Sequence, residues 1–197
     1  MPDTQTIPKA LIYEMDGDRP VYYRGYKDVL AGSKSIEEVR SSNQVQGFLI
    51  VLLVSHLSKQ LPEQYLIGIN KIGIQLGQSY RVADVAIFNR SKIDDALENT
   101  YAHEIPEVVL EVDTKHDQSD HDDDTDTAYI HRKTDALLMR GVRQVIWIFT
   151  KSRKITVATS SGPWLTSNWD APVDVLGASL LLISLVTQLE MGGGTSD

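Results

Sequence analysis

The sequence contains no cysteine among its 197 residues. A chain without cysteine can form neither a disulfide framework nor a metal site built on thiolates. The absence also fits a reducing compartment, and we therefore expect a cytoplasmic protein.

Long apolar runs are also missing. The longest, residues 48–54, covers only about a third of the length that a membrane-spanning helix needs. Residues 1–10 lack the apolar segment that a secretory signal requires. The sequence therefore predicts neither a membrane partner nor an exported protein.

Familiar nucleotide-binding and catalytic motifs are absent too. The chain has no Walker A motif, no G-x-S-x-G elbow and no G-x-G-x-x-G turn. Its five histidines do not have the spacing of metal ligands. His116 and His121 flank an aspartate-rich segment, which we interpret as a solvated loop.

Positive charge is in short supply, since the chain has 19 lysines and arginines against 27 acidic residues, a net charge of −8. Proteins that hold nucleic acid through its phosphates usually have at least one basic face. Six aspartates fall within residues 117–126, so much of the acidity is local. The composition lowers the odds of non-specific nucleic-acid binding but leaves room for a small basic cleft.

The remaining composition is that of an ordinary globular protein, 42% hydrophobic and 23% charged. We expect one domain over residues 1–197, with a core at about 10–190 and a flexible glycine-rich tail at 192–197.

Hydrophobic periodicity predicts an α/β protein with a mixed sheet and helices packed on it. A hairpin is expected at 11–24 and helices at 35–59 and 127–140. The predicted strands are 65–69, 72–76, 82–88, 108–113, 145–150 and 154–158. Residues 173–189 fit either a strand or a helix.

Asp84 lies inside the apolar strand predicted for residues 82–88. A buried aspartate is costly unless it is paired or binds a cation. An edge position, or a strand that begins after Asp84, would account for it equally well.

Charged residues also alternate with apolar ones along and just beyond the strand predicted for residues 108–113. Because side chains alternate along a strand, Glu111, Asp113 and Lys115 would occupy successive positions on one face. A fully solvated sheet face is the commoner reason for such alternation.

Lys133 lies on the inward stripe of the predicted second helix, three residues after Ile130 and four before Leu137. A lone lysine in this position usually extends its ammonium to the edge of the face. The alternative is that the ammonium reaches a carboxylate cluster on the sheet beneath.

Together, Asp84, Glu111 and a lysine would form a known chemical unit. Two carboxylates on adjacent strands hold a hard cation such as Mg²⁺, with Mn²⁺ as an alternative. The cation polarises a phosphodiester and lowers the pKa of its bound water. The lysine orients the attacking water or stabilises the charged phosphate.

The order and spacing of these residues resemble the Uma-two family of bacterial restriction endonucleases, in the PD-(D/E)XK phosphodiesterase superfamily. Residues 13–17 resemble the opening hairpin of that family, and residues 106–112 resemble its "P..vvEV" strand. Lys133 precedes Gly141 by the spacing that the family shows. The resemblance spans roughly residues 10–155 and implies a restriction-endonuclease-like fold, with a central mixed sheet flanked by helices.

The resemblance also implies roles for particular residues. Asp84 and Glu111 would bind the metal, helped by the backbone carbonyl of Val112. Glu14 would approach the same site from the N-terminal hairpin.

The chain departs from the family pattern in three places. Ala83 replaces the proline of the "PD" signature, and Gln44 lies near the helix histidine of many relatives. Asp113 occupies the lysine slot of E-x-K, so Lys133 or Lys115 would replace that lysine. We favour Lys133, which matches the helix position that relatives use, and Asp113 then becomes a third candidate ligand.

The sequence therefore predicts a Mg²⁺-dependent endonuclease that hydrolyses DNA, and a homodimer suits double-strand cleavage. One alternative is a nuclease fold without catalysis, serving as a nucleic-acid or protein interaction module, which Asp113 and the acidic charge favour. Another is a metal-dependent hydrolase of a small phosphate ester. If the substrate is a nucleic acid, we further expect basic residues around one cleft. The candidates are Arg81, Arg90, Lys92, Arg132 and Arg140.

Overall fold

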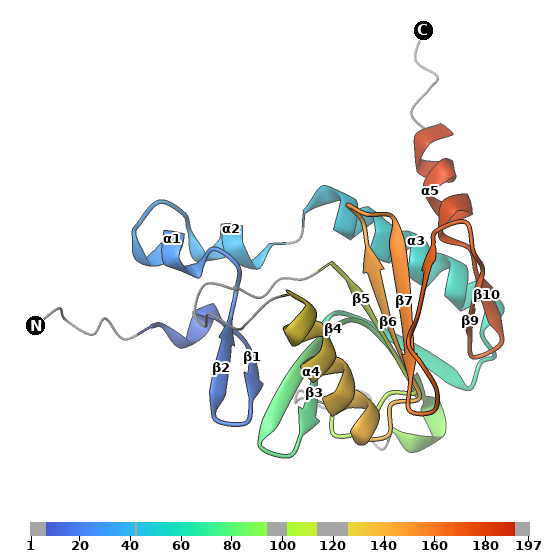
Figure 1. The fold of residues 1–197 in the computed structure, drawn as a ribbon, viewed down its shortest axis with the longest axis horizontal. Helices are drawn as coiled ribbons and strands as arrows, with labels where there is room; N and C mark the ends of the chain where they lie inside the picture. The colour runs from blue at the N-terminus through green and yellow to red at the C-terminus, as the bar shows by residue number, and fades with distance from the viewer. Residues whose placement is uncertain (1–6, 42, 94–101, 114–125, 192–197) are drawn as a thin grey trace, which may run out of the picture.

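A mixed sheet runs through the molecule, and the chain fills it out of sequence order (Figure 1). The computed structural model describes residues 7–41, 43–93, 102–113 and 126–191. Within them, an eight-stranded sheet has the order β2-β1-β4-β5-β6-β7-β8, and β3 pairs with β4. The β5–β6 pair is parallel, whereas β4 is antiparallel to β3 and β5. The predicted central mixed sheet is confirmed.

The elements have the following bounds. The strands of the large sheet are β1 (Ile12–Asp16), β2 (Arg19–Tyr22), β3 (Tyr65–Leu76), β4 (Ser79–Asn89), β5 (Val108–Val112), β6 (Gln144–Phe149), β7 (Lys154–Thr159) and β8 (Leu165–Asn168). A small hairpin consists of β9 (Val173–Val175) and β10 (Ala178–Leu180). The helices are α1 (Tyr26–Leu30), α2 (Ile36–Arg40), α3 (Gln44–Gln60), α4 (Asp126–Met139) and α5 (Leu182–Met191), with short 3₁₀ turns at Lys9–Leu11 and Arg90–Lys92.

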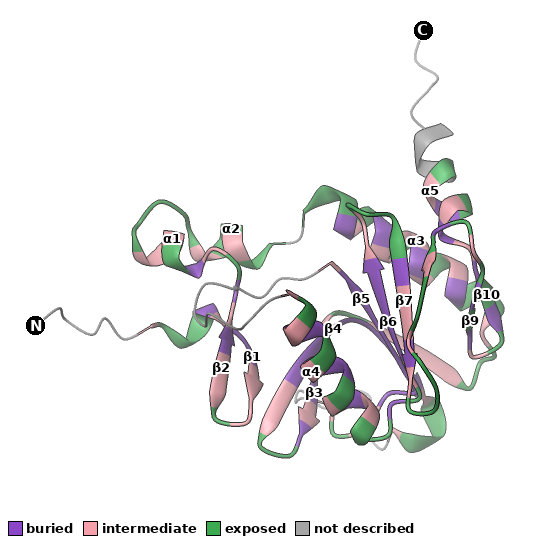
Figure 2. Cartoon of the chain, viewed as in Figure 1, coloured by how far each residue is buried: buried purple, intermediate pink, exposed green. Residues whose placement is uncertain are grey.

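Each face of the sheet has its own apolar core. Figure 2 shows that β5 and β6, in the middle of the sheet, are largely buried. On β5, Val108 and Leu110 join the core that contains α3 and α5. Val109 points the other way, into the core that contains α4. This is the alternation that the sequence predicts, and it places Glu111 on the α4 side. Among the described residues, no helix combines the length and apolarity that a membrane crossing requires.

The helix predicted for residues 35–59 is in fact two helices. Ser35 caps α2 in a capping box with Glu38, as predicted, and α2 ends at Arg40. Asn43 then caps α3, its side chain accepting a hydrogen bond from the Gln46 amide at 2.8 Å. The prediction failed because a second cap signal lies inside the apolar periodicity. The buried face of α3 is Gln46, Leu49, Leu53 and Leu57.

Two other predictions need correction. The strands expected at 65–69 and 72–76 are one strand, β3, whose pairing with β4 shifts register between Ile69 and Ile72. Residues 173–189, which fit a strand or a helix, contain both: the β9–β10 hairpin and then α5. The second predicted helix is confirmed as α4. The aspartate-rich loop before Asp126 and the glycine-rich tail lie outside the described residues.

Candidate active site

Asp84 and Glu111 lie side by side on adjacent strands in the middle of the sheet. The antiparallel pairing of Val85 with Leu110 brings β4 and β5 into register at this point. Both carboxylates are buried. Asp84 is five residues inside β4, which has partners on both sides. The alternative explanations by a strand edge or a late strand start are therefore wrong.

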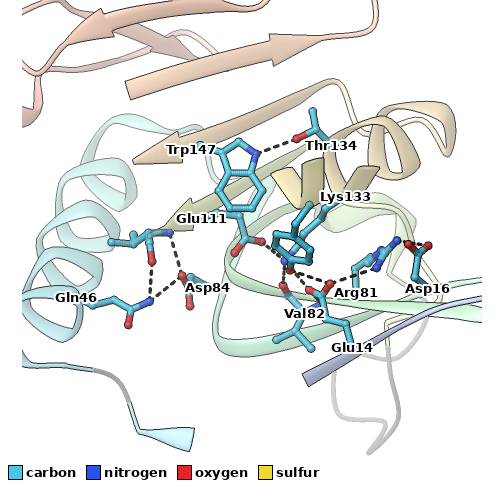
Figure 3. Close-up of polar contacts among 12 residues, drawn as sticks. Glu14, Asp16, Gln46, Arg81, Val82, Asp84, Glu111, Lys133, Thr134 and Trp147 are labelled. Carbon is cyan, nitrogen blue, oxygen red and sulfur yellow. Dashed lines mark hydrogen bonds and ion pairs between the residues drawn. The ribbon is translucent and has the colours of Figure 1, made fainter. Parts of the chain in front are cut away.

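The Asp84 carboxylate is held by two donors (Figure 3). Its Oδ2 accepts a hydrogen bond from the Val112 amide at 2.9 Å and another from Gln46 Nε2 at 3.0 Å. The same Gln46 nitrogen donates to the Val112 carbonyl at 2.9 Å. A buried amide on α3 thus bridges the carboxylate of β4 and the backbone oxygen at the end of β5.

The Lys133 ammonium lies on the other side of Glu111. Its Nζ is 3.0 Å from Glu111 Oε1 and 2.5 Å from Glu14 Oε1, and it donates to the Val82 carbonyl at 2.6 Å. Only 1% of the lysine surface is exposed. Lys133 therefore does not extend to the edge of the helix face; its ammonium ends within the carboxylate cluster, as the alternative interpretation predicts.

Glu14 connects the N-terminal hairpin to this cluster. The Val82 amide donates to its Oε1 at 2.9 Å, and the Tyr129 hydroxyl donates to its Oε2 at 3.0 Å. Arg81 Nη1 lies 3.4 Å from the same Oε2, and its Nη2 donates to Asp16 at 2.5 Å. Donors on β4 and α4 thus surround a carboxylate that is fully buried.

Burial raises the pKa of the Glu111 carboxyl to about 8. The Lys133 ammonium opposes this rise, whereas the charges of Asp84 and Glu14 add to it. Burial alone would lower the pKa of Lys133, but Glu111 and Glu14 outweigh burial, so that the pKa is raised. Lys133 accordingly remains a cation.

The donor set fits a hard divalent cation. Glu111 Oε1 is buried and accepts no hydrogen bond of normal geometry from the described residues. Asp84 and the Val112 carbonyl add further oxygens, the ligands that Mg²⁺ prefers. The described residues contain no cluster of three or more histidines or carboxylates able to hold a metal. They provide a carboxylate pair, and Mg²⁺ commonly completes such a shell with water.

Asp113 does not continue the charged face of β5, contrary to prediction. The strand ends at Val112, and Asp113 adopts a left-handed backbone with φ of 56°. Its two carboxylate oxygens accept hydrogen bonds from the amide and the hydroxyl of Thr150, at 2.9 and 2.6 Å. Asp113 thus connects the end of β5 to the end of β6. Lys115 lies outside the described residues, as do His116 and His121.

The glutamine that matters is not the one that the sequence pattern indicates. Gln44 is exposed, whereas Gln46 is buried beside Asp84. A signal for Gln46 exists, because it precedes Leu49 and Leu53 by three and seven residues on the buried stripe of α3. Sequence reasoning assigns Arg81 only to a cleft and does not single out Tyr129, although both contact Glu14.

The five basic residues expected around one cleft are dispersed. Arg81 is buried against Glu14, and Arg132 lies 3.5 Å from Asp16. Arg90 and Lys92 follow the end of β4. Lys92 pairs with Glu107, which precedes the start of β5, whereas Glu111 lies near its end. Arg140 donates to the Leu76 carbonyl. Arg81 and Arg132 thus lie together at Asp16, whereas Lys92 lies elsewhere, so the structure does not bring the five residues to one place.

The raised pKa of Glu111 should make stability depend on pH. In the unfolded chain this carboxyl ionises near its ordinary pKa of about 4.3, whereas in the folded protein it keeps its proton up to about pH 8. The folded state therefore binds more protons between these values, and the free energy of unfolding falls as the pH rises through them. Glu111→Gln should abolish this contribution. In urea titrations with EDTA, the variant should gain on the order of a few kcal/mol relative to wild type from about pH 5 to pH 8; a constant difference would contradict the raised pKa.

Removal of the buried ammonium should be far more damaging than removal of an exposed one. Lys133→Met removes the buried cation that Glu14 and Glu111 share and should lower the free energy of unfolding by roughly 3–5 kcal/mol. Lys92→Met also breaks an ion pair, but 59% of the Lys92 side chain is exposed, and its cost should stay below about 1 kcal/mol. Equal destabilisation of the two variants, measured by urea unfolding, would show that the Lys133 cluster is not energetically distinct.

Comparison with known proteins finds a similar crystal structure and a matching family model. The chain resembles a crystal structure described as "a putative nuclease belonging to DUF820" from Anabaena variabilis, with a TM-score of 0.57 and 16% identity over 74% of this chain and 79% of that one. At this identity the likeness establishes the fold alone. No curated protein matches the sequence. Residues 34–189 match the family model of Uma2, described as "Putative restriction endonuclease". The chain therefore belongs to the Uma2 family.

Proposed function

We propose that the protein is a Mg²⁺-dependent endonuclease that hydrolyses phosphodiester bonds of DNA. The observation that supports this most directly is the buried pair of Asp84 and Glu111 with the Lys133 ammonium 3.0 Å from Glu111. Burying such a group of charges is expensive, and apolar residues of similar volume stabilise a core as well or better. Metal-assisted chemistry gives the group a reason to exist.

The residues have separable tasks in this proposal. Asp84, Glu111 and the Val112 carbonyl would hold Mg²⁺ or Mn²⁺, which would supply Lewis acidity toward the phosphodiester and a more acidic water. Gln46 holds Asp84 and the Val112 carbonyl in a fixed relation. Lys133 stays protonated and offers a positive charge close to the phosphate.

Glu14 acts as a positioning residue. It accepts the closest hydrogen bond of Lys133 and is itself fixed by the Val82 amide and the Tyr129 hydroxyl. The lysine can therefore not swing freely, which keeps its charge where a phosphate would develop negative charge in the transition state.

Divalent-metal binding is the first test. We expect calorimetry to show Mg²⁺ or Mn²⁺ binding by the wild type, and Asp84→Asn and Glu111→Gln to abolish it. Glu107→Gln is the matched control, because Glu107 is also a buried glutamate, next to the start of β5, but pairs with Lys92 and Arg143. Its variant should bind metal like the wild type.

Cleavage assays on supercoiled plasmid decide between the alternatives. The wild type and Glu107→Gln should nick or linearise DNA only with the metal, and the two ligand variants should not. A wild type that binds neither ion at millimolar concentration would favour the interaction-module alternative, supported by Asp113 in the lysine slot. Hydrolysis of a small phosphodiester without cleavage of DNA would favour the phosphate-ester hydrolase.

A homodimer is the assembly that we propose for double-strand cleavage, with one site for each strand. Three apolar residues spaced by three along α3 are solvent-exposed: Val45 (60%), Phe48 (50%) and Val51 (62%). Such a row is a reasonable contact surface. Light scattering at micromolar concentration should report a dimer for the wild type and a monomer for Phe48→Glu. A monomeric wild type would exclude this dimer.

A further inference from the structure

The bulge in β3 is a strained segment near the candidate active site. Asn70 and Lys71 both adopt left-handed backbone conformations, with φ of 68° and 63°. Asparagine tolerates this region, but lysine rarely occupies it because its Cβ approaches the following carbonyl oxygen. Strain of this kind persists only where the surrounding structure enforces it, and it concentrates at functional sites.

The position of the bulge is as informative as its strain. Ile69 pairs with Val85, and Ile72 pairs with Ala83, so Asn70 and Lys71 lie opposite the single residue between them on β4. That residue is Asp84. A two-against-one bulge redirects side chains, and bulges are frequent beside active sites. Here the redirected residue is a lysine.

The Lys71 side chain lines a cavity of about 640 Å³, together with Arg40, Tyr23 and Tyr80. Its Nζ donates to the backbone carbonyl of Arg40 and lies 4.9 Å from the centre of the Tyr23 ring. An ammonium has three donors, and in the described part of the chain no carboxylate pairs with this one. Burial, followed by the Arg40 charge, lowers the pKa of Lys71, although Asp84 acts in the opposite direction.

Arg40 is in the same situation. It lines the same cavity, and its exposed guanidinium forms no ion pair with any described residue. Glu37 is the only acid among the described lining residues, and it forms no ion pair with either cation there. In a chain with 27 acidic and 19 basic residues, two neighbouring cations without a carboxylate partner require an explanation. An anionic ligand provides one.

The cavity borders two residues that contact the candidate active site. Val82 and Tyr13 are also among its lining residues. The Val82 carbonyl holds the Lys133 ammonium, and the Tyr13 ring centre lies 5.5 Å from the same nitrogen. A molecule in the cavity would therefore lie against the β1 and β4 residues that contact the Lys133 ammonium.

We propose that this cavity binds a backbone phosphate of DNA adjacent to the bond that is cut, with Lys71 and Arg40 as its ligands. The volume falls in the range of roughly 300–1,000 Å³ that is usual for ligand sites, and the tyrosines offer surfaces for a neighbouring sugar or base. The inference rests on the proposed nuclease function and specifies where its substrate lies. Lys71 and Arg40 are not among the five basic residues that the sequence analysis expects around a cleft.

The test is binding of a fluorescent DNA duplex to the full chain in EDTA, followed by anisotropy over a series of salt concentrations. We expect Arg40→Gln/Lys71→Gln to weaken binding about tenfold or more at low salt. The magnitude of the slope of log Kd against log salt concentration should also decrease by about 0.9 for each phosphate that the variant no longer neutralises. Lys71→Arg should retain most of the affinity.

The matched control is Lys59→Gln/Arg90→Gln, which removes the same charge from exposed positions at the far end of α3 and β4. Its binding and salt slope should match the wild type. A third variant, Lys71→Gly, removes the side chain and also relieves the left-handed strain, and urea unfolding of this variant shows whether weaker binding comes with a loss of stability.

Four outcomes would overturn the inference. If the cavity pair and the control pair weaken binding equally, the effect is one of net charge. If the cavity pair binds and cleaves DNA like the wild type, this site is wrong while the nuclease proposal stands. If the wild type neither binds nor cleaves DNA, both proposals fail. Equal affinity for a deoxynucleoside monophosphate and for the duplex would identify a small phosphate ester as the ligand and exclude the DNA-backbone contact.

Discussion

The buried ammonium of Lys133 is the interaction on which the arrangement of the candidate site depends. It joins three parts of the chain: Glu14 on the N-terminal hairpin, Glu111 on β5 and the Val82 carbonyl on β4. Each partner would be costly to bury alone, because neither an ammonium nor a carboxylate tolerates an apolar surrounding without compensation. The lysine therefore sets the position of the hairpin against the sheet as well as the charge of the site.

Charge is distributed unevenly around this lysine. On one side, Glu14 receives donors from Val82, Tyr129 and Arg81. On the other side, Glu111 has the Lys133 charge but no hydrogen bond of normal geometry at Oε1 among the described residues, and its pKa is raised to about 8. Two glutamates that contact one cation thus differ in how well they are satisfied. The better satisfied one suits a positioning role, and the other is the one that suits a metal ion.

The parts of the site that follow from local pattern could be predicted from the sequence. Alternation along β5 and the helical stripe of α4 place Glu111 and Lys133 on facing surfaces, and the polar residue in an apolar strand marks Asp84. What failed depends on backbone geometry without a local signal. Asp113 leaves the strand with a positive φ and bonds to Thr150. The break expected between residues 69 and 72 coincides with the bulge at Asn70 and Lys71, but the pattern indicates two strands and does not show that β3 continues through it. Gln46 is within reach of pattern reasoning, but the cap at Asn43 shifts the helix from its expected start.

The Glu14–Lys133 contact has a consequence for how the protein is made. The two residues are 119 positions apart in the sequence, and contacts of such separation form late because they close a long loop. During synthesis the hairpin leaves the ribosome long before α4 exists, and Glu14 has no cation to bury against until most of the chain has followed. The lysine likewise has no fixed position until it meets that carboxylate. A chain that stops before α4 therefore lacks the cation of the site, and the site is complete only when the N-terminal hairpin and α4 have come together.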